Sequence, residues 1–426
     1  MAQWTVQNKK RPGAYVNFES VNNTIVPLEG NSVVAVIVPN SWGVAGTFVE
    51  VDATSDFRSL FGKTIDELIP IRETLKGTGK VLVYNGSNDS GSKATVTEDG
   101  ITVEAMYKGV AGNQLHVLFT KQIDNTFEVS TIFFGKLVDK QMVSGFPFEN
   151  EYVKVNGSFP VDDKTVTLTG GVDGVMTNNE VEQFLAALDT QEFRCVALHT
   201  SVTATKQLVV AKVKKWRDEG RSIIGVLANV EADYEGIISV ANGVTLTDGT
   251  KLTAGECVYF VAGKTAGAGV LSNTFKTYVG AIDCERKTHA QEDELIDKGQ
   301  LVFTYRNGKV IILTDINTLT TFTVEKNSDF SKNKLIRTMD TINDNVQYIF
   351  TNYFIGQIAN DVNGRELFKQ RIVSDILDVL VNKRALTYKA EEIQVEQGVN
   401  KDSVIVTLPV VLTDAMEKLY MTVECR

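Results

Sequence analysis

A series of strands and helices in this sequence stops, gives way to a different pattern, and then resumes. Continuous apolar segments, each expected to be a strand, lie at residues 32–40, 80–86, 193–200 and 221–229, with helical segments between them. Apolar runs without alternation are typical of strands buried on both faces of a sheet. Strands that alternate with helices predict a parallel sheet. The sequence therefore predicts one α/β domain whose two halves are separated by an insertion.

The expected insertion occupies residues 92–170. There, apolar residues alternate with polar ones in short segments separated by turns, and a Gly- and Ser-rich stretch precedes them. This period of two is typical of half-buried strands, so we expect a β-sandwich or a small barrel. The α/β domain then consists of residues 31–91 and 171–319. A terminal arm at 1–30 precedes it and a last domain at 320–426 follows it.

The last domain begins with two predicted helices. On each helix the apolar residues recur at spacings of three and four, which places them in one stripe. We expect Ser331 or Asp329 to cap the first helix and Asn363, with Glu366 as a capping-box partner, to begin the second. The two stripes consist of Leu335, Met339, Ile342, Val346, Ile349 and Tyr353 and of Leu367, Phe368, Ile372, Ile376, Leu377 and Leu380.

The period then changes to two, which predicts strands at the end of the chain. The first strand places Val404, Val406, Leu408, Val410 and Leu412 on one face. The segment TDAMEK is the expected turn, and a last strand places Leu419, Met421 and Val423 on one face. A terminal strand is an edge, which is either hidden within its own subunit or given to another chain.

The arm at residues 1–30 also predicts a short strand, which contains Tyr15, Val16 and Phe18. On the residues alone, docking on the chain's own sheet and donation to a neighbour are equally open.

Several segments resemble the contractile phage tail sheath protein family. In the last domain these are TFTVEKNSDFSKNKLIRTMDTI, NGRELFKQRIVSDILDVL and DAMEKLYMTVECR, and earlier in the chain they are KRPGAYVNF and YKGVAGNQLHV. The resemblance implies a multidomain α/β and α+β fold. Its parts are a subtilisin-like α/β domain that carries the inserted β domain, and a C-terminal assembly domain completed by the N-terminal arm. It also implies a structural protein without enzymatic activity, cofactor or metal site.

The function implied by this resemblance is mechanical. Subunits form stacked rings of six around a tail tube, and contraction of the sheath drives the tube through a target cell envelope. Implied partners are other copies of the chain, the tail tube protein, and baseplate and tail terminator proteins. The implied location is a virion tail or a phage-tail-like particle, such as a bacteriocin, assembled in the host bacterial cytoplasm. The residues implied in strand exchange between subunits are Tyr15, Val16, Phe18, Leu419, Met421 and Val423.

Charge limits the other partners. The net charge is −10, which argues against a general nucleic-acid binder. No apolar run approaches the roughly 20 residues of a membrane span, so we expect no membrane insertion.

The last domain is nevertheless locally basic, which indicates either a solvated helix face or a patch that contacts an acidic tail tube. The cations that suggest this are Lys326 and the six possible tube contacts, Lys332, Lys334, Arg337, Arg365, Lys369 and Arg371.

The alternative function is a subtilisin-like hydrolase. The histidines are His116, His199 and His289, and His199 is the best triad candidate because it ends a predicted strand. No G-x-S-x-G motif accompanies it. Cys195 lies four residues before His199, but a zinc site would need two further ligands. The segment AGKTAGAG lacks the first glycine of a phosphate-binding loop, and we expect small residues at a helix end there. We therefore predict a non-enzyme.

Overall fold

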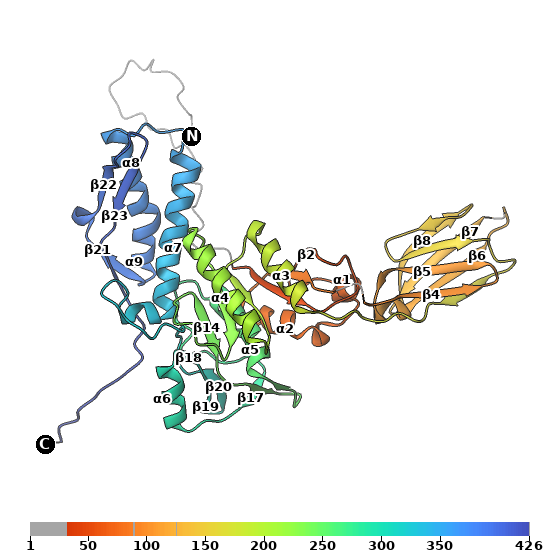
Figure 1. Ribbon diagram of the computed structural model, residues 1–426, viewed down its shortest axis with the longest axis horizontal. Coiled ribbons are helices and arrows are strands. Elements are labelled where there is room, and N and C mark those ends of the chain that lie inside the picture. The colour runs from red at the N-terminus through yellow and green to blue at the C-terminus, as the bar shows by residue number, and fades with distance from the viewer. Residues whose placement is uncertain (1–31, 88–89, 125, 426) are drawn as a thin grey trace, which may run out of the picture.

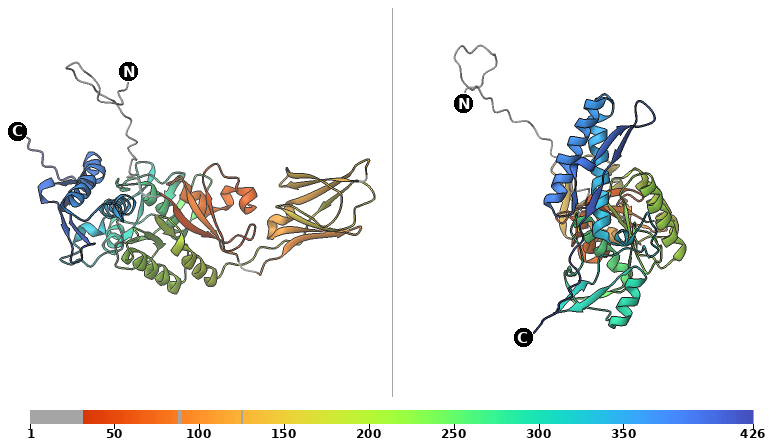
Figure 2. Two further views of the ribbon diagram at one scale, coloured as in Figure 1. Left: turned by 90° about the horizontal axis from the view of Figure 1, so that it is seen from above. Right: turned by 90° about the vertical axis from the view of Figure 1, so that its left-hand side faces the viewer.

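The computed structural model describes residues 32–87, 90–124 and 126–425. Figure 1 shows an elongated molecule with the inserted β strands at one end and the long C-terminal helices at the other. The α/β elements lie between them, and the view from above in Figure 2 gives the same order.

A seven-stranded sheet forms the centre of the molecule, in the order β18-β14-β13-β12-β1-β3-β2. The expected parallel pairing of the apolar runs is confirmed, because β1 pairs in parallel with both β3 and β12. The antiparallel edge strand β2 was not predicted. The strands are β1 (Val34–Val38), β2 (Phe48–Val51), β3 (Val81–Asn85), β12 (Cys195–Ala197), β13 (Ile224–Ala228), β14 (Ile237–Val240) and β18 (Gln300–Leu301).

Helices cover both faces of this sheet. One face packs on α1 (Phe57–Phe61), α2 (Ile69–Leu75) and α5 (Ala254–Gly267), and the other on α3 (Asn178–Ala187) and α4 (Thr203–Asp218). Each face therefore has its own apolar core.

Small residues bring α5 close to the end of α2. A β-carbon at Gly263 would lie 2.2 Å from the carbonyl oxygen of Thr74, and one at Gly267 would lie 2.1 Å from that of Gly77. The segment AGKTAGAG thus lies at the end of α5, as expected, and packs closely against the end of α2.

The insertion forms two four-stranded antiparallel sheets that share one apolar core. One sheet consists of β4 (Lys93–Glu98), β5 (Ile101–Lys108), β10 (Val153–Gly157) and β9 (Phe148–Glu149). The other consists of β11 (Lys164–Thr167), β6 (Leu115–Lys121), β7 (Phe127–Phe133) and β8 (Lys136–Val143). The two ends of the insertion meet, because Ser92 and Val172 form an antiparallel bridge.

The remaining α/β elements form a small lobe beside the sheet. Its hairpin turns at Asn307 and Gly308, which have φ angles of 51° and 79°. Positive φ at both turn positions matches the type I′ turn expected there. The elements are β15 (Val244–Leu246), β16 (Lys251–Leu252), β17 (Ala281–Cys284), α6 (His289–Asp297), β19 (Phe303–Arg306) and β20 (Lys309–Ile312).

The last domain is built on α7 (Asn333–Ile349), α8 (Val362–Ile372) and α9 (Asp378–Asn382). A π-helical turn extends α7 through Phe350–Phe354, and a second joins α8 to α9 at Val373–Leu377. Most of the predicted stripe residues pack in the core between these helices. Leu367 is an exception at 43% exposure. Phe368, one position on and about 100° around the helix, faces the core instead.

The predicted caps of these helices were wrong. Asn327 caps a short 3₁₀ turn, Ser328–Ser331, and α7 follows with Lys332 at its N-cap position. The side chain of Asp361 accepts a hydrogen bond from the amide of Gly364 at 2.7 Å, so α8 begins at Val362, earlier than expected. Asp361 thus satisfies a free amide of α8, while Asn327 caps only the 3₁₀ turn that precedes α7.

A long hairpin follows the helices. β21 (Leu386–Tyr388) pairs with β24 (Val410–Leu412), and β22 (Gln394–Gln397) pairs with β23 (Val404–Thr407). The predicted face is confirmed, since Val404, Val406, Leu408, Val410 and Leu412 all pack against the helical core. The expected turn at TDAMEK and the paired strand after it are absent from the described part of the single chain, because residues 413–425 form neither helix nor strand.

Candidate functional site

The C-terminal arm, residues 413–425, runs away from the domain that precedes it (Figures 1 and 2). Its apolar side chains face solvent, with Leu419 85% and Met421 74% exposed. Met416, Tyr420 and Val423 are also exposed. A run of exposed apolar residues of this size marks a surface that another molecule covers. The three predicted donor residues of this arm therefore lie together on an uncovered segment.

The base of the C-terminal arm is fastened to its own subunit. The Lys334 ammonium donates to the carbonyl oxygen of Thr413, and the Lys332 ammonium to the carboxylate of Glu417. The other oxygen of Glu417 accepts a hydrogen bond from the Thr274 hydroxyl at 2.6 Å. Burial lowers the pKa of Lys334. The arm is thus held as far as Glu417, while the apolar residues beyond it extend outward.

Two of the predicted tube-contact residues, Lys334 and Arg337, are buried in the subunit, which corrects that expectation for them, while Lys332 is partly exposed and binds the C-terminal arm. Lys332 and Lys334 hold the base of the arm, and Lys334 is only 8% exposed. Arg337 is 2% exposed, and its Nη2 lies 2.7 Å from Oδ2 of Asp315. Burial raises the pKa of Asp315, but the charge of Arg337 and several hydrogen bonds outweigh it and leave the pKa low. A buried guanidinium with a buried partner has no face for a second protein.

The other three predicted residues lie on α8 and remain partly exposed. Nζ of Lys369 donates to the carbonyl oxygen of Ile393 at 2.8 Å, and Nη1 of Arg365 to that of Asn360 at 3.1 Å. Arg371 pairs with Asp375 on the same helix at 3.0 Å. These cations and the three discussed above thus each bind a group of their own subunit. Lys326, the seventh, pairs with Glu235 at 2.6 Å.

A polar network ties α7 to the α/β domain. Oδ1 of Asp340 lies 2.8 Å from Nη2 of Arg217, and Oδ2 of Asp344 lies 2.6 Å from Nη1 of Arg194. Burial lowers the pKa of Arg217, but the charge of Asp340 raises it more, so this guanidinium stays charged. The oxygen Oδ2 of Asp340 also lies 3.4 Å from Arg194. Sequence reasoning missed this network, whose only sign was two acids on the polar side of the α7 stripe.

The N-terminal donor residues Tyr15, Val16 and Phe18 lie outside the described residues. Their proposed role in strand exchange stays a prediction.

Two parts of the chain match known protein domains. Residues 174–318 match the phage tail sheath protein central domain, and residues 325–426 match the phage tail sheath C-terminal domain. The chain belongs to the phage tail sheath family. It is a structural sheath subunit of the kind found in contractile tails and contractile injection systems.

Relatives extend the match over the whole chain. A protein of the PBSX phage-like element of Bacillus subtilis strain 168 is 31% identical, over 99% of this chain and 98% of its own length. The tail sheath protein of Clostridium phage phiCD119 is 26% identical, over 58% of this chain and 76% of its own. The crystal structure of the sheath tail protein from Desulfitobacterium hafniense superposes with a TM-score of 0.83 at 34% identity, covering 96% of this chain and 99% of that one.

More distant sheaths share the fold. The helical sheath of the anti-feeding prophage in its contracted state has a TM-score of 0.59 at 14% identity, over 98% of this chain and 99% of that one.

The residues considered for catalysis lie on separate elements. His199 lies beside Gly255 at the start of α5, and its backbone amide donates to the Tyr259 hydroxyl at 3.3 Å. Nδ1 of His116 lies 2.8 Å from the hydroxyl of Thr167 in the insertion, and His289 begins α6. This placement gives the hydrolase alternative no support.

Within residues 32–87, 90–124 and 126–425, no group of three His, Cys, Asp or Glu side chains could hold a metal ion. The cysteines Cys195, Cys257 and Cys284 are free and buried, and burial raises the pKa of Cys195 to about 12. Cys425 is free and exposed on the C-terminal arm. No helix in the described ranges is both long and apolar enough to cross a membrane.

Proposed function

We propose that this chain polymerises by strand exchange into stacked rings of six subunits around a tail tube, and that the polymer contracts to drive the tube through a cell envelope. The observation that carries this proposal is the C-terminal arm, whose base is fastened while its apolar end is uncovered. An uncovered apolar strand in one subunit calls for a sheet edge in another.

The long hairpin of the last domain is the proposed acceptor. Within the described chain each of its strands pairs with one other strand, so both outer edges are available for further pairing. Ile405 and Val411 expose apolar side chains on the face opposite the helical core, at 53% and 69%. Each main-chain hydrogen bond to an added strand would contribute roughly 0.5–1.5 kcal/mol. Each apolar side chain buried there would add about 1.5–3 kcal/mol.

Both termini act as donors in this proposal. Leu419, Met421 and Val423 form the apolar face of the C-terminal donor. Tyr15, Val16 and Phe18 form that of the N-terminal donor, which completes the C-terminal domain of a neighbour.

The same proposal assigns a place to each domain. The α/β halves, 31–91 and 171–319, form a subtilisin-like body, and the insertion at 92–170 lies on the outside of the sheath. The position of the insertion at the end of the molecule opposite α8 supports this arrangement (Figure 1). The assembly domain, 320–426, lies toward the tube, where Arg365, Lys369 and Arg371 on α8 are the proposed contacts.

During contraction, the subunit is proposed to rotate as one body while its arms hold the neighbours. Support comes from the buried ion pairs of Asp340 on α7 with Arg194 and Arg217, which join the two domains. The Lys332–Glu417 pair separates this body from the exposed end of the arm.

The energy for contraction is stored when the sheath assembles, so no nucleotide, cofactor or catalytic residue takes part. Baseplate, tube and terminator proteins complete the particle, which assembles in the host bacterial cytoplasm.

Negative-stain electron microscopy of the purified full-length chain tests this proposal. We expect tubes with a regular axial repeat, formed by the chain alone or on addition of its tail tube protein. A chain that stays dispersed under both conditions, while circular dichroism shows it folded, would contradict the proposal.

A further inference from the structure

A groove of about 740 Å³ opens beside the base of the C-terminal arm. Its walls come from α6, from the β19–β20 hairpin and the loop after it, and from Glu417 and Lys418 of the arm itself. The exposed charged residues Asp293 and Arg306 also line it. Its apolar lining includes Phe275, Ile296, Leu313 and Phe322. The groove thus combines apolar anchors with charged groups, as the surfaces of protein interfaces do.

Phe275 lies in the wall of this groove in a strained backbone conformation. Its φ angle is 61°, in the left-handed region that bulky side chains avoid. Its side chain is 53% exposed, and the guanidinium carbon of Arg306 lies 5.6 Å from the centre of its ring. Strain of this kind persists where the surrounding structure imposes it, and it collects at binding sites. The single chain leaves half exposed the ring that this conformation presents.

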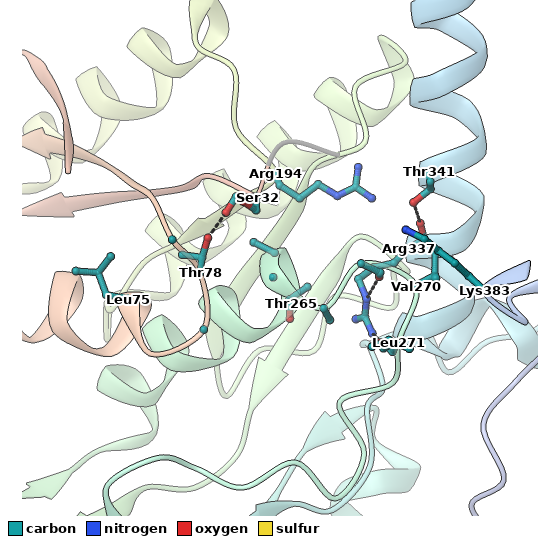
Figure 3. Close-up of a pocket in the computed structure, with 16 residues that line it drawn as sticks. Ser32, Leu75, Thr78, Arg194, Thr265, Val270, Leu271, Arg337, Thr341 and Lys383 are labelled. Atoms are coloured by element: carbon teal, nitrogen blue, oxygen red, sulfur yellow. Dashed lines mark hydrogen bonds between the residues drawn. The ribbon is translucent and has the colours of Figure 1, made fainter. Parts of the chain in front are cut away.

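The loop that carries Phe275 is fixed from behind. Arg337 donates to the carbonyl oxygen of Leu271 at 2.6 Å, and Figure 3 shows the two residues side by side. The carboxylate of Asp315 accepts a hydrogen bond from the amide of Asn273 at 2.9 Å. The ring is therefore held by a rigid support, so little conformational freedom is lost when another molecule covers it.

Phe322 is a second aromatic anchor in the same groove, and its side chain is 50% exposed. Its loop is also fixed on both sides. Asp233 accepts a hydrogen bond from the amide of Thr321 at 2.9 Å, and Lys326 pairs with Glu235 at 2.6 Å. Aromatic side chains held in this way are the usual anchors of a protein interface.

The C-terminal arm indicates which molecule covers the groove. The hydroxyl of Thr274, which precedes Phe275, donates to Glu417 at 2.6 Å, so the arm leaves the subunit at this groove. Val423 lies six residues after Glu417, and six residues of extended chain reach at most about 20 Å. A copy that accepts the arm must therefore lie within that distance of the groove.

We infer that this groove is a second interface between copies of the chain, that Phe275 is its anchor, and that the copy that accepts the arm also covers the groove. The inference rests on the proposed strand exchange, because the reach of the arm is what brings the acceptor copy to the groove. Once the arm is bound, the groove contact forms within one complex and needs little affinity of its own. The arm alone would hold the acceptor copy on a flexible tether, whereas the groove fixes its orientation.

Assembly of Phe275→Asn in the full-length chain tests this inference. Asn tolerates a left-handed backbone, so the variant keeps the loop and loses the ring. We expect wild-type circular dichroism and a critical concentration for assembly, measured by light scattering, that rises about tenfold, which corresponds to about 1.4 kcal/mol. Leu137→Asn is the matched control, because Leu137 is also 53% exposed but lies in the insertion, and it should assemble as the wild type does.

The outcomes separate the groove from strand exchange. An unchanged critical concentration in Phe275→Asn, or an equal rise in both variants, would overturn the inference and leave strand exchange standing. A wild-type chain that stays dispersed would contradict the proposed function and this inference with it.

A photocrosslinker identifies what covers the ring. With p-benzoylphenylalanine in place of Phe275, we expect crosslinked dimers on a denaturing gel from the assembled chain, and none from the same chain diluted below its critical concentration. A crosslink within one chain at both concentrations would show that the chain covers its own groove, which would overturn the inference. An assembled chain that gives no crosslink would overturn it as well.

Discussion

At the scale of single residues, the last domain depends on buried charges that are paired across the domain boundary. Asp340 lies on α7, while its partners Arg194 and Arg217 lie in the α/β domain. Buried charges of this kind are tolerated only when every partner is present. These residues therefore set how the two domains fit together.

Removing the charge of Asp340 should be strongly destabilising. We expect Asp340→Asn to lower the free energy of unfolding by about 3–5 kcal/mol, because it leaves buried guanidinium charge uncompensated. Urea denaturation followed by circular dichroism measures the change. Glu294→Gln is the matched control, since Glu294 pairs with Lys298 on the exposed face of α6 and should contribute nothing measurable. A similar denaturation curve for both variants would contradict this role.

Asp233 should make the folded chain less stable at acidic pH. Its carboxylate accepts hydrogen bonds from the amides of Thr321 and Thr320, at 2.9 and 2.8 Å, and these lower its pKa from 3.8 to about 2. A group whose pKa is lower in the folded state stabilises the fold above its unfolded pKa and loses that effect as the pH falls. We expect the unfolding midpoint of the wild type to fall more steeply between pH 4 and pH 2 than that of Asp233→Asn. Parallel curves would rule out this contribution.

At the scale of elements, the spacing of apolar residues predicted which face of a helix or strand packs in the core. It did not predict the polar faces that are buried against residues distant in the sequence. The α7 stripe was correct at Leu335 and Ile349, which are buried. The polar side of the same helix is buried as well, and its sequence gives no sign of this because the partners lie just before β12 and on α4. A buried polar side chain resembles a solvated one until its partner is known.

Charge pairing explains the error in the predicted tube patch. Lys332, Lys334 and Arg337 lie close together in the sequence at the start of a helix, which indicates a basic surface. Their acceptors come from the C-terminal arm and from the loop that holds Asp315, neither of which is adjacent in the sequence. The alternation in the C-terminal arm, in contrast, predicts a strand for which the described chain offers no partner.

The hairpin gives a prediction about an element. We expect Val411→Asp to leave the subunit folded and to block polymerisation, because its side chain is exposed in the single chain and becomes buried under an added strand. Light scattering measures assembly and circular dichroism measures folding. Ile123→Asp is the matched control, since Ile123 is fully exposed in the insertion, away from the hairpin. Polymerisation of the Val411→Asp variant at the wild-type rate would exclude this face as an interface.

At the scale of the whole molecule, the order of the domains was predictable because apolar residues recur in a different pattern in each domain. Continuous apolar runs predicted the strands of the central sheet, and the alternation of apolar and polar residues predicted the inserted β domain. The edge strand β2 was missed because Phe48–Val51 is short and only partly buried. How the domains fit together was also missed, since that depends on ion pairs such as Asp340–Arg217 between distant residues.

The insertion should be removable. We expect deletion of residues 92–170, replaced by a short glycine linker, to leave a folded chain that still forms tubes. The two ends already meet, because a β-carbon at Gly91 would lie 2.6 Å from the carbonyl oxygen of Val172. Trp42, which stacks on Phe133 at 4.7 Å, loses that partner, so we expect some loss of thermal stability. A folded, soluble chain that never assembles would place the insertion within the contacts between subunits.

The most direct test of the strand-exchange proposal is electron microscopy of a chain that ends at Lys418. This truncation removes the exposed apolar end of the C-terminal arm and keeps Glu417, which fastens the base of the arm to Thr274 and Lys332. Under conditions in which the full-length chain forms tubes, we expect the truncated chain to show wild-type circular dichroism and only dispersed subunits in negative stain. Regular tubes from the truncated chain, at the same protein concentration, would contradict strand exchange through this arm.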